Sequence, residues 1–332
     1  MKFAVFAPVA PATADPVWIA GFARHVEAQG FESLVVAEHT VLATRYSSVY
    51  PYDPSGRVDV PPECPVPDPL DLLAFLAGQT TTLGLATGVL VLPNHHPVVL
   101  AKRVATVDAL SGGRLRLCAG VGWLREEITA CGVSFESRGR RADEQIAVLR
   151  ALWSDAPGVS HRGEFFDFEN VVCNPKPVAG ERFPIHIGGH SPAAARRAGR
   201  LGDGFWPLGV TAAELPHLLD LMRSAALGAD RDPDAVELSL GHAVTKIDPD
   251  RAGRLAEQGA VRAVLAMPAV TDLAQAEDLL SACAQRLGLI PANLLFADAS
   301  GVAWYSPPAK RALHLRLGER AHRLDIVSPP LV

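Results

Sequence analysis

The chain has 332 residues, of which 48% are hydrophobic and 20% charged, and its formal net charge at pH 7 is −5. This composition is typical of a globular protein with a large core, and the acidic balance excludes the basic surface that nucleic-acid binding requires. The sequence also has no basic run typical of a membrane patch and no apolar stretch of the ~18 residues that span a bilayer. We therefore expect a small-molecule partner, with no nucleic acid and no membrane.

Short apolar runs alternate with helical patterns along the chain. Prolines near the helix starts and glycines near their ends help to set the bounds of the helices. The predicted strands, each with the helix that follows it, are in chain order 2–8 with 16–30, 31–39 with 69–81, 83–92 with 97–110, 114–123 with 140–153, 184–188 with 193–201, 204–208 with 212–227, 235–241 with 249–258, and 261–267 with 271–288.

This alternation predicts an α/β fold. Nearly continuous apolar strands separated by helices indicate a parallel sheet, and eight units fit a closed (β/α)8 TIM barrel. An open doubly wound sheet is the alternative, and we favour the barrel because no Gly-x-Gly-x-x-Gly pattern follows the first strand. In a barrel, the active site lies at the C-terminal ends of the strands.

Two segments interrupt the alternation, so we expect insertions on the C-terminal face of the barrel. Residues 41–67 are rich in proline, carry three tyrosines and form either a wall of a substrate pocket or a plain surface loop. Residues 156–182 look like an excursion with a short hairpin. We predict a barrel domain over residues 1–290 and a C-terminal extension of unassigned structure over 291–332.

The five cysteines are an odd number, and no Cys-x-x-Cys pattern occurs. This usage indicates reduced thiols in a cytoplasmic protein, without a zinc ribbon or a disulfide framework. The N-terminal residues 1–8 loosely imitate a signal peptide, but their short apolar run is better explained by a buried first strand. No His-x-His or His-Glu-x-x-His pattern occurs either, so no metal is expected.

Residues 183–198 join a β-branched run, two glycines and an alanine-rich helical pattern. Gly188 and Gly189 let the backbone turn tightly, His190 or Ser191 can cap the helix, and Pro192 suits its first turn. The free N–H groups and partial positive charge of a helix start suit a phosphate. The segment is either such an anion cradle or an ordinary turn. As a hydrolase nucleophile elbow it fits poorly, because Pro192 lacks the N–H that an oxyanion hole needs.

Glu38 and His39 end the second predicted strand. Histidine titrates near neutrality and can donate a proton or a hydrogen bond to a reacting centre. Glu38 can orient His39 or accept a substrate proton. The alternative for a lone histidine at a strand end is a structural role. His95 and His96 precede a predicted helix, which they can cap, or they can contact a ligand phosphate, and we favour the structural role.

Arg138, Arg140 and Arg141 precede the helical pattern over 143–150. They can reach a phosphate or carboxylate, but a solvated charged helix start is the simpler interpretation. The aromatic group Phe165, Phe166 and Phe168, together with the loop 41–67, suggests an apolar or aromatic pocket wall.

Several stretches together resemble the luciferase-like monooxygenase superfamily and, within it, the actinobacterial deazaflavin (coenzyme F420)-dependent oxidoreductases. They are Glu38-His39 and residues 86–93, 96–102, 106–115, 120–125, 174–177 and 185–189. The resemblance covers residues 1–210 and fades afterwards. It implies a (β/α)8 barrel that binds a flavin or deazaflavin at the strand C-termini, with a non-proline cis peptide at Gly88-Val89 whose bulge backs the ring. Family members are often dimers, so we expect a homodimer.

The resemblance also implies the site residues. The expected cofactor-binding residues are Gly88, Val89, Gly122, Trp123, Gly188, Gly189, His190 and Ser191. Related deazaflavin enzymes keep an acidic residue and a histidine near the ring, which here are Glu38 and His39, with His39 as the proton donor or hydrogen-bonding partner. The glutamate that some sugar-phosphate relatives use after their fourth strand is not clearly matched, because Arg125 or Glu126 lies there.

The implied reaction is hydride transfer between the F420 ring carbon and a small organic substrate, for which the cofactor supplies the redox chemistry. An FMN-dependent monooxygenase of the same fold is the alternative within the family. From a different class, a TIM-barrel hydrolase or a non-catalytic flavin-binding relative remains open.

Overall fold

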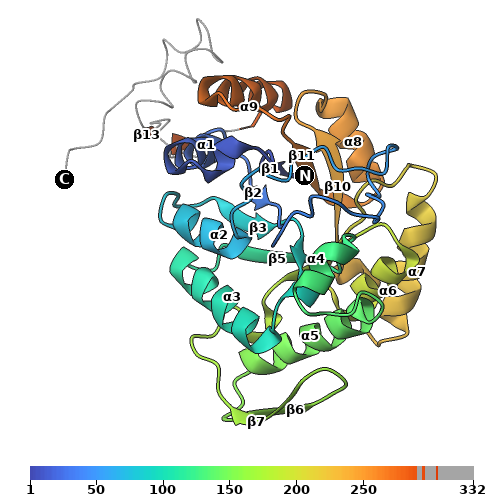
Figure 1. The fold of residues 1–332 in the computed structure, drawn as a ribbon. Helices are drawn as coiled ribbons and strands as arrows, with labels where there is room; N and C mark the ends of the chain where they lie inside the picture. Colours follow the sequence, from blue (N-terminus) through green and yellow to red (C-terminus); the bar gives the residue numbers. More distant parts are fainter. Residues whose placement is uncertain (290–293, 296–303, 306–332) are drawn as a thin grey trace, which may run out of the picture.

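Eight parallel strands close into a barrel in the computed structural model, which describes residues 1–289, 294–295 and 304–305 (Figure 1). The barrel strands are β1 (Lys2–Phe6), β2 (Ser33–Val36), β3 (Gly84–Thr87), β5 (Leu115–Gly120), β8 (Ile185–Gly188), β9 (Gly204–Trp206), β10 (Glu237–Ala243) and β11 (Ala260–Ala266). β1 pairs in parallel with both β2 and β11, which closes the ring. The predicted (β/α)8 barrel is confirmed.

Helices surround the strands (Figure 1). They are α1 (Pro16–Ala28), α2 (Pro69–Ala77), α3 (Pro97–Ser111), α4 (Arg125–Ala130), α5 (Arg138–Trp153), α6 (Pro192–Leu201), α7 (Leu215–Leu227), α8 (Pro249–Glu257) and α9 (Leu273–Leu287). Short 3-10 turns occur at Pro11–Ala14, Leu92–Asn94, Gly180–Arg182 and Pro233–Ala235. The side chains of Asp15, Asp68, Ser191 and Asp248 cap helices that begin with proline, which is why these starts could be predicted. Only the short α4 was not predicted.

The predicted strand over 83–92 is wrong in one respect, because it is split into β3 and β4 (Leu90–Val91). The peptide bond between Gly88 and Val89 is cis, as the family resemblance implied, and the chain bulges there. The Thr87 hydroxyl donates to the Cys118 carbonyl at 2.7 Å and accepts from the Cys118 N–H at 3.0 Å. This side chain therefore joins β3 to β5 where the backbone ladder stops.

Apolar side chains fill the middle of the barrel, and charges close its N-terminal end. The middle layer consists of Ala4, Val35, Ala86, Cys118, Trp206 and Val264. Below it, the guanidinium of Arg262 lies 3.0 Å from a carboxylate oxygen of Glu32 and 3.0 Å from one of Glu237. Arg116 also pairs with Glu32, at 3.2 Å. This end of the barrel is therefore closed, and the cavity described below opens at the other end of the strands.

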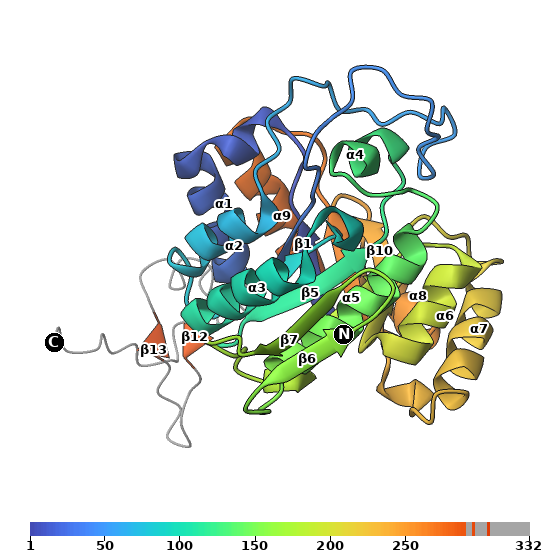
Figure 2. The ribbon, with the colours of Figure 1, turned by 60° about the horizontal axis from the view of Figure 1, so that its bottom comes forward.

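The predicted hairpin in 156–182 is present as β6 (Val159–Arg162) and β7 (Asp167–Val171), which pair antiparallel beside α5 (Figure 2). The Glu144 carboxylate on α5 accepts the N–H groups of Phe165 and Phe166. The ring of Phe166 contacts His96, 5.4 Å away between centroids. The hairpin therefore packs on the outside of the barrel.

None of the helices among the described residues is long and apolar enough to cross a bilayer. All five cysteines lie in the described part of the chain and are free thiols. The predicted extension over 291–332 lies outside the described residues, apart from the antiparallel pair β12 (Leu294–Leu295) and β13 (Trp304–Tyr305). The division into a barrel domain and an extension stays a prediction.

Candidate active site

A cavity of about 1160 Å³ opens at the carboxyl ends of the strands. The residues that were expected to be catalytic or to bind the cofactor all line it, including Glu38 and His39 after β2 and Trp123 after β5. The segment between β2 and α2 passes over this end beside α4 (Figure 2). The structure thus brings the nominated residues together, while their roles stay predictions.

His39 is held by a residue that the sequence analysis missed. Its Nδ1 lies 3.0 Å from Oε2 of Glu127, and the other carboxylate oxygen of Glu127 accepts the Thr40 N–H at 2.6 Å. Because a carboxylate only accepts hydrogen bonds, the hydrogen lies on Nδ1, and Nε2 is left for the cavity. Glu127 lies in the first turn of α4, directly after the Arg125 and Glu126 that sequence reasoning had weighed.

Glu38 does not orient His39. One of its carboxylate oxygens lies 2.7 Å from Nε2 of His95, and the other accepts the Val91 N–H. The residue is 6% exposed, and both of its oxygens are engaged. Glu38 therefore holds the segment that follows the Gly88–Val89 bulge, and His95 has the structural role that was expected of it.

Three glycines make room for the bulge. The Val89 side chain packs against the ends of β5 and β8, where a Cβ on Gly120 would come within 2.7 Å of Val89 Cγ2 and a Cβ on Gly188 would overlap Val89 Cγ1. A Cβ on Gly88 would overlap the Val35 side chain. A side chain at Gly120 or Gly188 would displace Val89, and one at Gly88 would displace Val35. The three glycines therefore leave Val89 as a low apolar surface, which we call the platform, on this side of the cavity.

The same cavity also carries two groups with positive electrostatic potential, the start of α6 and Arg138. Ser191 caps α6 by accepting the Ala194 N–H at 3.1 Å, and Gly189 has a φ of +126°, which favours glycine. The guanidinium of Arg138 lines the same cavity, donates to the Gly122 carbonyl and stacks 3.5 Å from the centroid of the Phe135 ring. A helix start and a guanidinium in one cavity suit an anion such as a phosphate. We refer to Ser191, the start of α6 and Arg138 as the anion-binding end of the cavity.

The side chains of the three arginines in the first turn of α5 go to different places. Arg138 faces the cavity, whereas Arg140 pairs with Glu164 on the outer hairpin and Arg141 stacks on Phe166. Only the first of them could contact a ligand in this cavity.

The loop 41–67 supplies a wall, as one of the two interpretations predicted. The rings of Tyr46 and Tyr50 lie edge-on to Trp123, with centroids 5.7 and 5.0 Å away. Tyr52 continues the row toward His190, at 5.2 Å. Burial raises the pKa of Tyr52 to about 12, so its phenol stays neutral.

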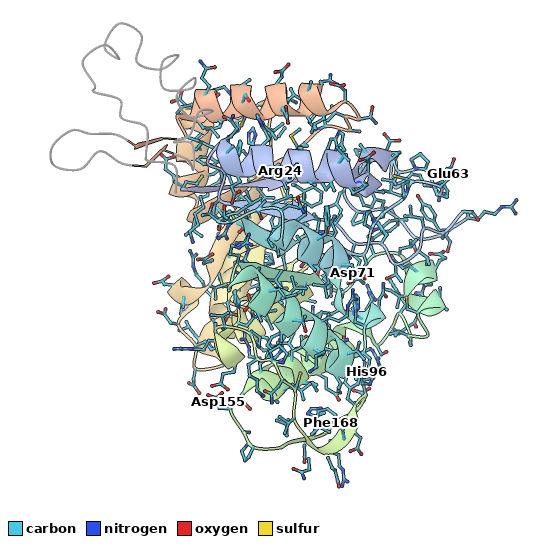
Figure 3. The ribbon with its side chains drawn as sticks, turned by 90° about the vertical axis from the view of Figure 1, so that its left-hand side faces the viewer. Arg24, Glu63, Asp71, His96, Asp155 and Phe168 are labelled. Atoms are coloured by element: carbon cyan, nitrogen blue, oxygen red, sulfur yellow. The ribbon has the colours of Figure 1, made fainter. Side chains whose placement is uncertain are left out.

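Phe165, Phe166 and Phe168 do not contribute to this wall, which corrects that part of the expectation. They belong to the hairpin β6–β7 and are absent from the cavity lining. In Figure 3, Phe168 lies at the bottom of the molecule, whereas Glu63 of the loop lies at the upper right. The sequence could not place these three residues, because the pattern of an aromatic cluster is the same whether the cluster lines the cavity or packs outside the barrel.

Among the described residues, no group of three or more His, Cys, Asp or Glu side chains is arranged to hold a metal ion. The sequence model of the family described as luciferase-like monooxygenase matches residues 1–287. The chain belongs to this family. Its members are oxidoreductases and monooxygenases that use flavin-type cofactors, and the barrel and bulge described above fit that assignment.

Three relatives illustrate the range of this family. An uncharacterized protein of Mycobacterium tuberculosis is 33% identical over 210 residues, 63% of this chain and 72% of that protein. The F420-dependent glucose-6-phosphate dehydrogenase of Kineococcus radiotolerans is 30% identical over 194 residues, 57% of this chain and 52% of that enzyme. The FMNH2-dependent dimethylsulfone monooxygenase of Pseudomonas fluorescens is 33% identical over 154 residues, 46% and 41% of the two chains.

A solved structure shares the fold of this luciferase-like protein. The F420-dependent secondary alcohol dehydrogenase in complex with an F420–acetone adduct superposes with a TM-score of 0.69 at 17% identity, over 85% of this chain and 97% of that one. Similar proteins therefore include enzymes named for F420 and for FMN, which leaves the choice of cofactor to the site itself.

Proposed function

We propose that this protein is a deazaflavin (F420)-dependent oxidoreductase that transfers a hydride between the cofactor and a small organic substrate. The observation that carries the proposal is that the His39–Glu127 pair lines the same cavity as a glycine-lined platform and an anion-binding end. The names of the F420-dependent relative and structural neighbour support the same cofactor.

The residues present fit such a cofactor. Val89, seated against Gly120 and Gly188, offers a low apolar surface for a planar ring. Ser191, the start of α6 and the Arg138 guanidinium offer donors and positive charge for a phosphate. Gly122, Trp123 and His190 line the space between them. When bound, the deazaflavin supplies a ring carbon that accepts or releases a hydride.

The chain itself handles the proton and the positioning. With the hydrogen on Nδ1 fixed by Glu127, Nε2 of His39 can take a proton from a substrate hydroxyl, or return one to a carbonyl oxygen in the reverse direction. Glu38 acts through the backbone, because it holds Val91 and thereby the bulge that carries Val89. We propose Glu38 as a positioning residue rather than a proton acceptor.

The second candidate is an FMN-dependent monooxygenase, which the name of the Pseudomonas fluorescens relative favours. FMN also carries a planar ring and a phosphate, so the same platform and anion-binding end would serve it. The two candidates differ in which cofactor binds tightly and in whether oxygen is consumed.

A fluorescence titration of the purified protein with F420 and, separately, with FMN tests the proposal. We expect micromolar binding of F420 and much weaker binding of FMN. A preference for FMN would move the protein to the oxygen-using branch. Binding of neither cofactor would overturn the proposal in favour of a hydrolase or a non-catalytic relative.

Gly188→Ala tests the platform. The added methyl group would overlap Val89 Cγ1, so we expect the Kd for F420 to rise by about tenfold, or about 1.4 kcal/mol. Gly253→Ala on α8 is the matched control, because its new Cβ would meet nothing within 4 Å. An unchanged Kd in Gly188→Ala would show that the platform is not part of the cofactor site.

The expected homodimer and cytoplasmic location also stay proposals. Light scattering coupled to size-exclusion chromatography measures the oligomeric state directly.

A further inference from the structure

The cavity has room for more than a cofactor. At about 1160 Å³ it exceeds the roughly 300–1000 Å³ of most small-molecule sites. The platform and the anion-binding end occupy the side formed by β3, β5 and β8. The loop 41–67 forms another wall, and the chemistry of that wall indicates what binds beside the cofactor.

The loop sorts its side chains by polarity. Its residues that line the cavity are Ser47, Ser48, Val49, Tyr50, Pro51, Tyr52, Val58 and Val60. The charged residues of the same loop, which are Arg45, Asp53, Arg57, Asp59 and Glu63, are all absent from the lining. Arg57 instead donates to the Tyr46 carbonyl and lies over the Tyr46 ring. The loop thus presents an apolar and aromatic inner face.

The serine hydroxyls of this wall are already paired. The hydroxyls of Ser47 and Ser48 donate to the Glu126 carboxylate on α4, which also accepts the Ser47 N–H. Burial raises the pKa of Glu126, but the hydrogen bonds from Ser48 and Ser47 together outweigh it and lower the pKa to about 2, so the carboxylate that anchors the loop stays ionised. The anchor fixes the position of the aromatic residues that follow.

The charged groups that line the rest of the cavity are also compensated on the loop side. Arg125 pairs with Glu136, and both oxygens of Glu127 are engaged by His39 and Thr40. Arg138 carries positive charge, but it lies at the Gly122 carbonyl on the anion-binding side. A charged ligand on the loop wall would therefore lose water without gaining an oppositely charged partner there.

The aromatic rings of this wall approach His39, the residue proposed to exchange a proton with the substrate. Tyr50 lies between Trp123 and Tyr52, with centroid distances of 5.0 and 5.4 Å, and His39 lies 6.2 Å from Trp123. Ring-to-ring contacts of this kind make a rigid surface, which binds apolar groups at a small cost in side-chain entropy. Because Trp123 contacts both Tyr50 and His39, a molecule that packs on Tyr50 and Trp123 can reach His39 with a polar atom.

From this arrangement we infer that the substrate is a neutral, mainly apolar molecule with a hydrocarbon ring, whose hydroxyl or carbonyl oxygen meets Nε2 of His39, and that Tyr50 determines this specificity. The inference rests on the proposed function for the role of the bound molecule as substrate. Sugar phosphates and other anions are excluded from the loop wall.

Binding of a neutral fluorescent probe tests this inference. N-phenyl-1-naphthylamine is titrated into the protein with and without saturating F420, and then displaced with 1-tetralol, 1-tetralone or glucose 6-phosphate. We expect the probe to bind together with F420, the two neutral compounds to displace it, and glucose 6-phosphate to leave it bound. Tyr50→Ala should raise the probe Kd about tenfold, through loss of a buried aromatic contact, whereas Tyr50→Phe should retain it.

Val172→Ala is the matched control, because Val172 is an apolar residue that is 54% exposed and absent from the cavity lining. Displacement by glucose 6-phosphate, an unchanged Kd in Tyr50→Ala, or competition between probe and F420 would each overturn the inference. Failure of the proposed function has a different signature, which is the absence of F420 binding. In that case the measurements on the cofactor-free protein still decide whether the loop wall selects neutral molecules.

Discussion

His39→Asn is expected to lower kcat for hydride transfer by about 10²–10⁴-fold, the usual contribution of a positioned general acid or base. Asparagine cannot exchange a proton, whereas Nε2 of His39 faces the cavity with its tautomer fixed by Glu127. The measurement is the rate of F420 reduction with the alcohol that the wild type oxidises fastest, together with the F420 Kd. We expect the Kd to change little, because His39 contributes to the chemistry more than to cofactor binding.

A second histidine–glutamate pair provides the control. Nε2 of His161 lies 3.1 Å from Oε1 of Glu144, at the outer hairpin and away from the cavity. His161→Asn removes a similar pair and should leave kcat unchanged. Glu127→Gln should give an intermediate loss and a shifted pH profile, because the glutamine still accepts from Thr40 while the charge beside His39 is lost. If His39→Asn retains wild-type kcat, the histidine is structural and the proposed proton transfer is wrong.

Arg262→Ala should have the largest effect on folding, a loss of about 3–5 kcal/mol in the free energy of unfolding. Arg262 is 2% exposed and pairs with both Glu32 and Glu237. Its removal therefore takes the buried guanidinium that the two carboxylates share, and leaves Glu32 only Arg116 and Glu237 only the more exposed Lys2 as strong cationic partners. Urea unfolding at pH 7 measures the loss. Arg162→Ala is the control, because Arg162 also faces two carboxylates but its side chain is 79% exposed, where such pairs contribute less than about 1 kcal/mol. Equal stability of the two variants would contradict the prediction.

The same cluster predicts an acid dependence of stability. Burial alone would raise the pKa of Glu32, but the hydrogen bonds from Arg262 and the charge of Arg116 outweigh it and lower the pKa from 4.5 to about 2. A carboxyl whose pKa is depressed in the folded state stabilises the protein fully at a pH above its unfolded-state pKa. That contribution is lost as the pH falls through its folded-state pKa. We therefore expect this contribution to be complete above pH 4.5 and to vanish toward pH 2. Arg262→Ala should weaken that dependence.

The two ends of the barrel thus have separate tasks. The ionic cluster at the N-terminal end touches no residue of the cavity wall formed by the loop 41–67, and the cavity at the other end depends on small residues and paired polar groups. In TIM barrels generally, the C-terminal loops carry catalysis and the opposite end carries stability. Variants of the cluster and of the cavity should accordingly affect different measurements.

Sequence patterns alone determined the alternation of strands and helices, because the signals involved are local. A proline in the first turn, an acidic or serine cap and an apolar run each act within a few residues, so the eight units could be read directly. The glycines at 88, 188 and 189 were also informative, since a glycine marks a close approach wherever the chain later folds. The family resemblance added the cis peptide at Gly88-Val89, which the structure contains.

Only the tertiary structure decided which side chains meet. Glu127 lies in a six-residue helix too short to show a helical period, and its contact with His39 spans 88 positions of the sequence. Glu38 turns to His95 and Val91 instead, two partners that lie more than 50 positions away in the sequence. The aromatic residues of the hairpin and of the loop look alike in sequence, but closure of the ring places the first outside the barrel and the second over its cavity. Local patterns specify elements, whereas contacts between distant residues exist only once the barrel has closed.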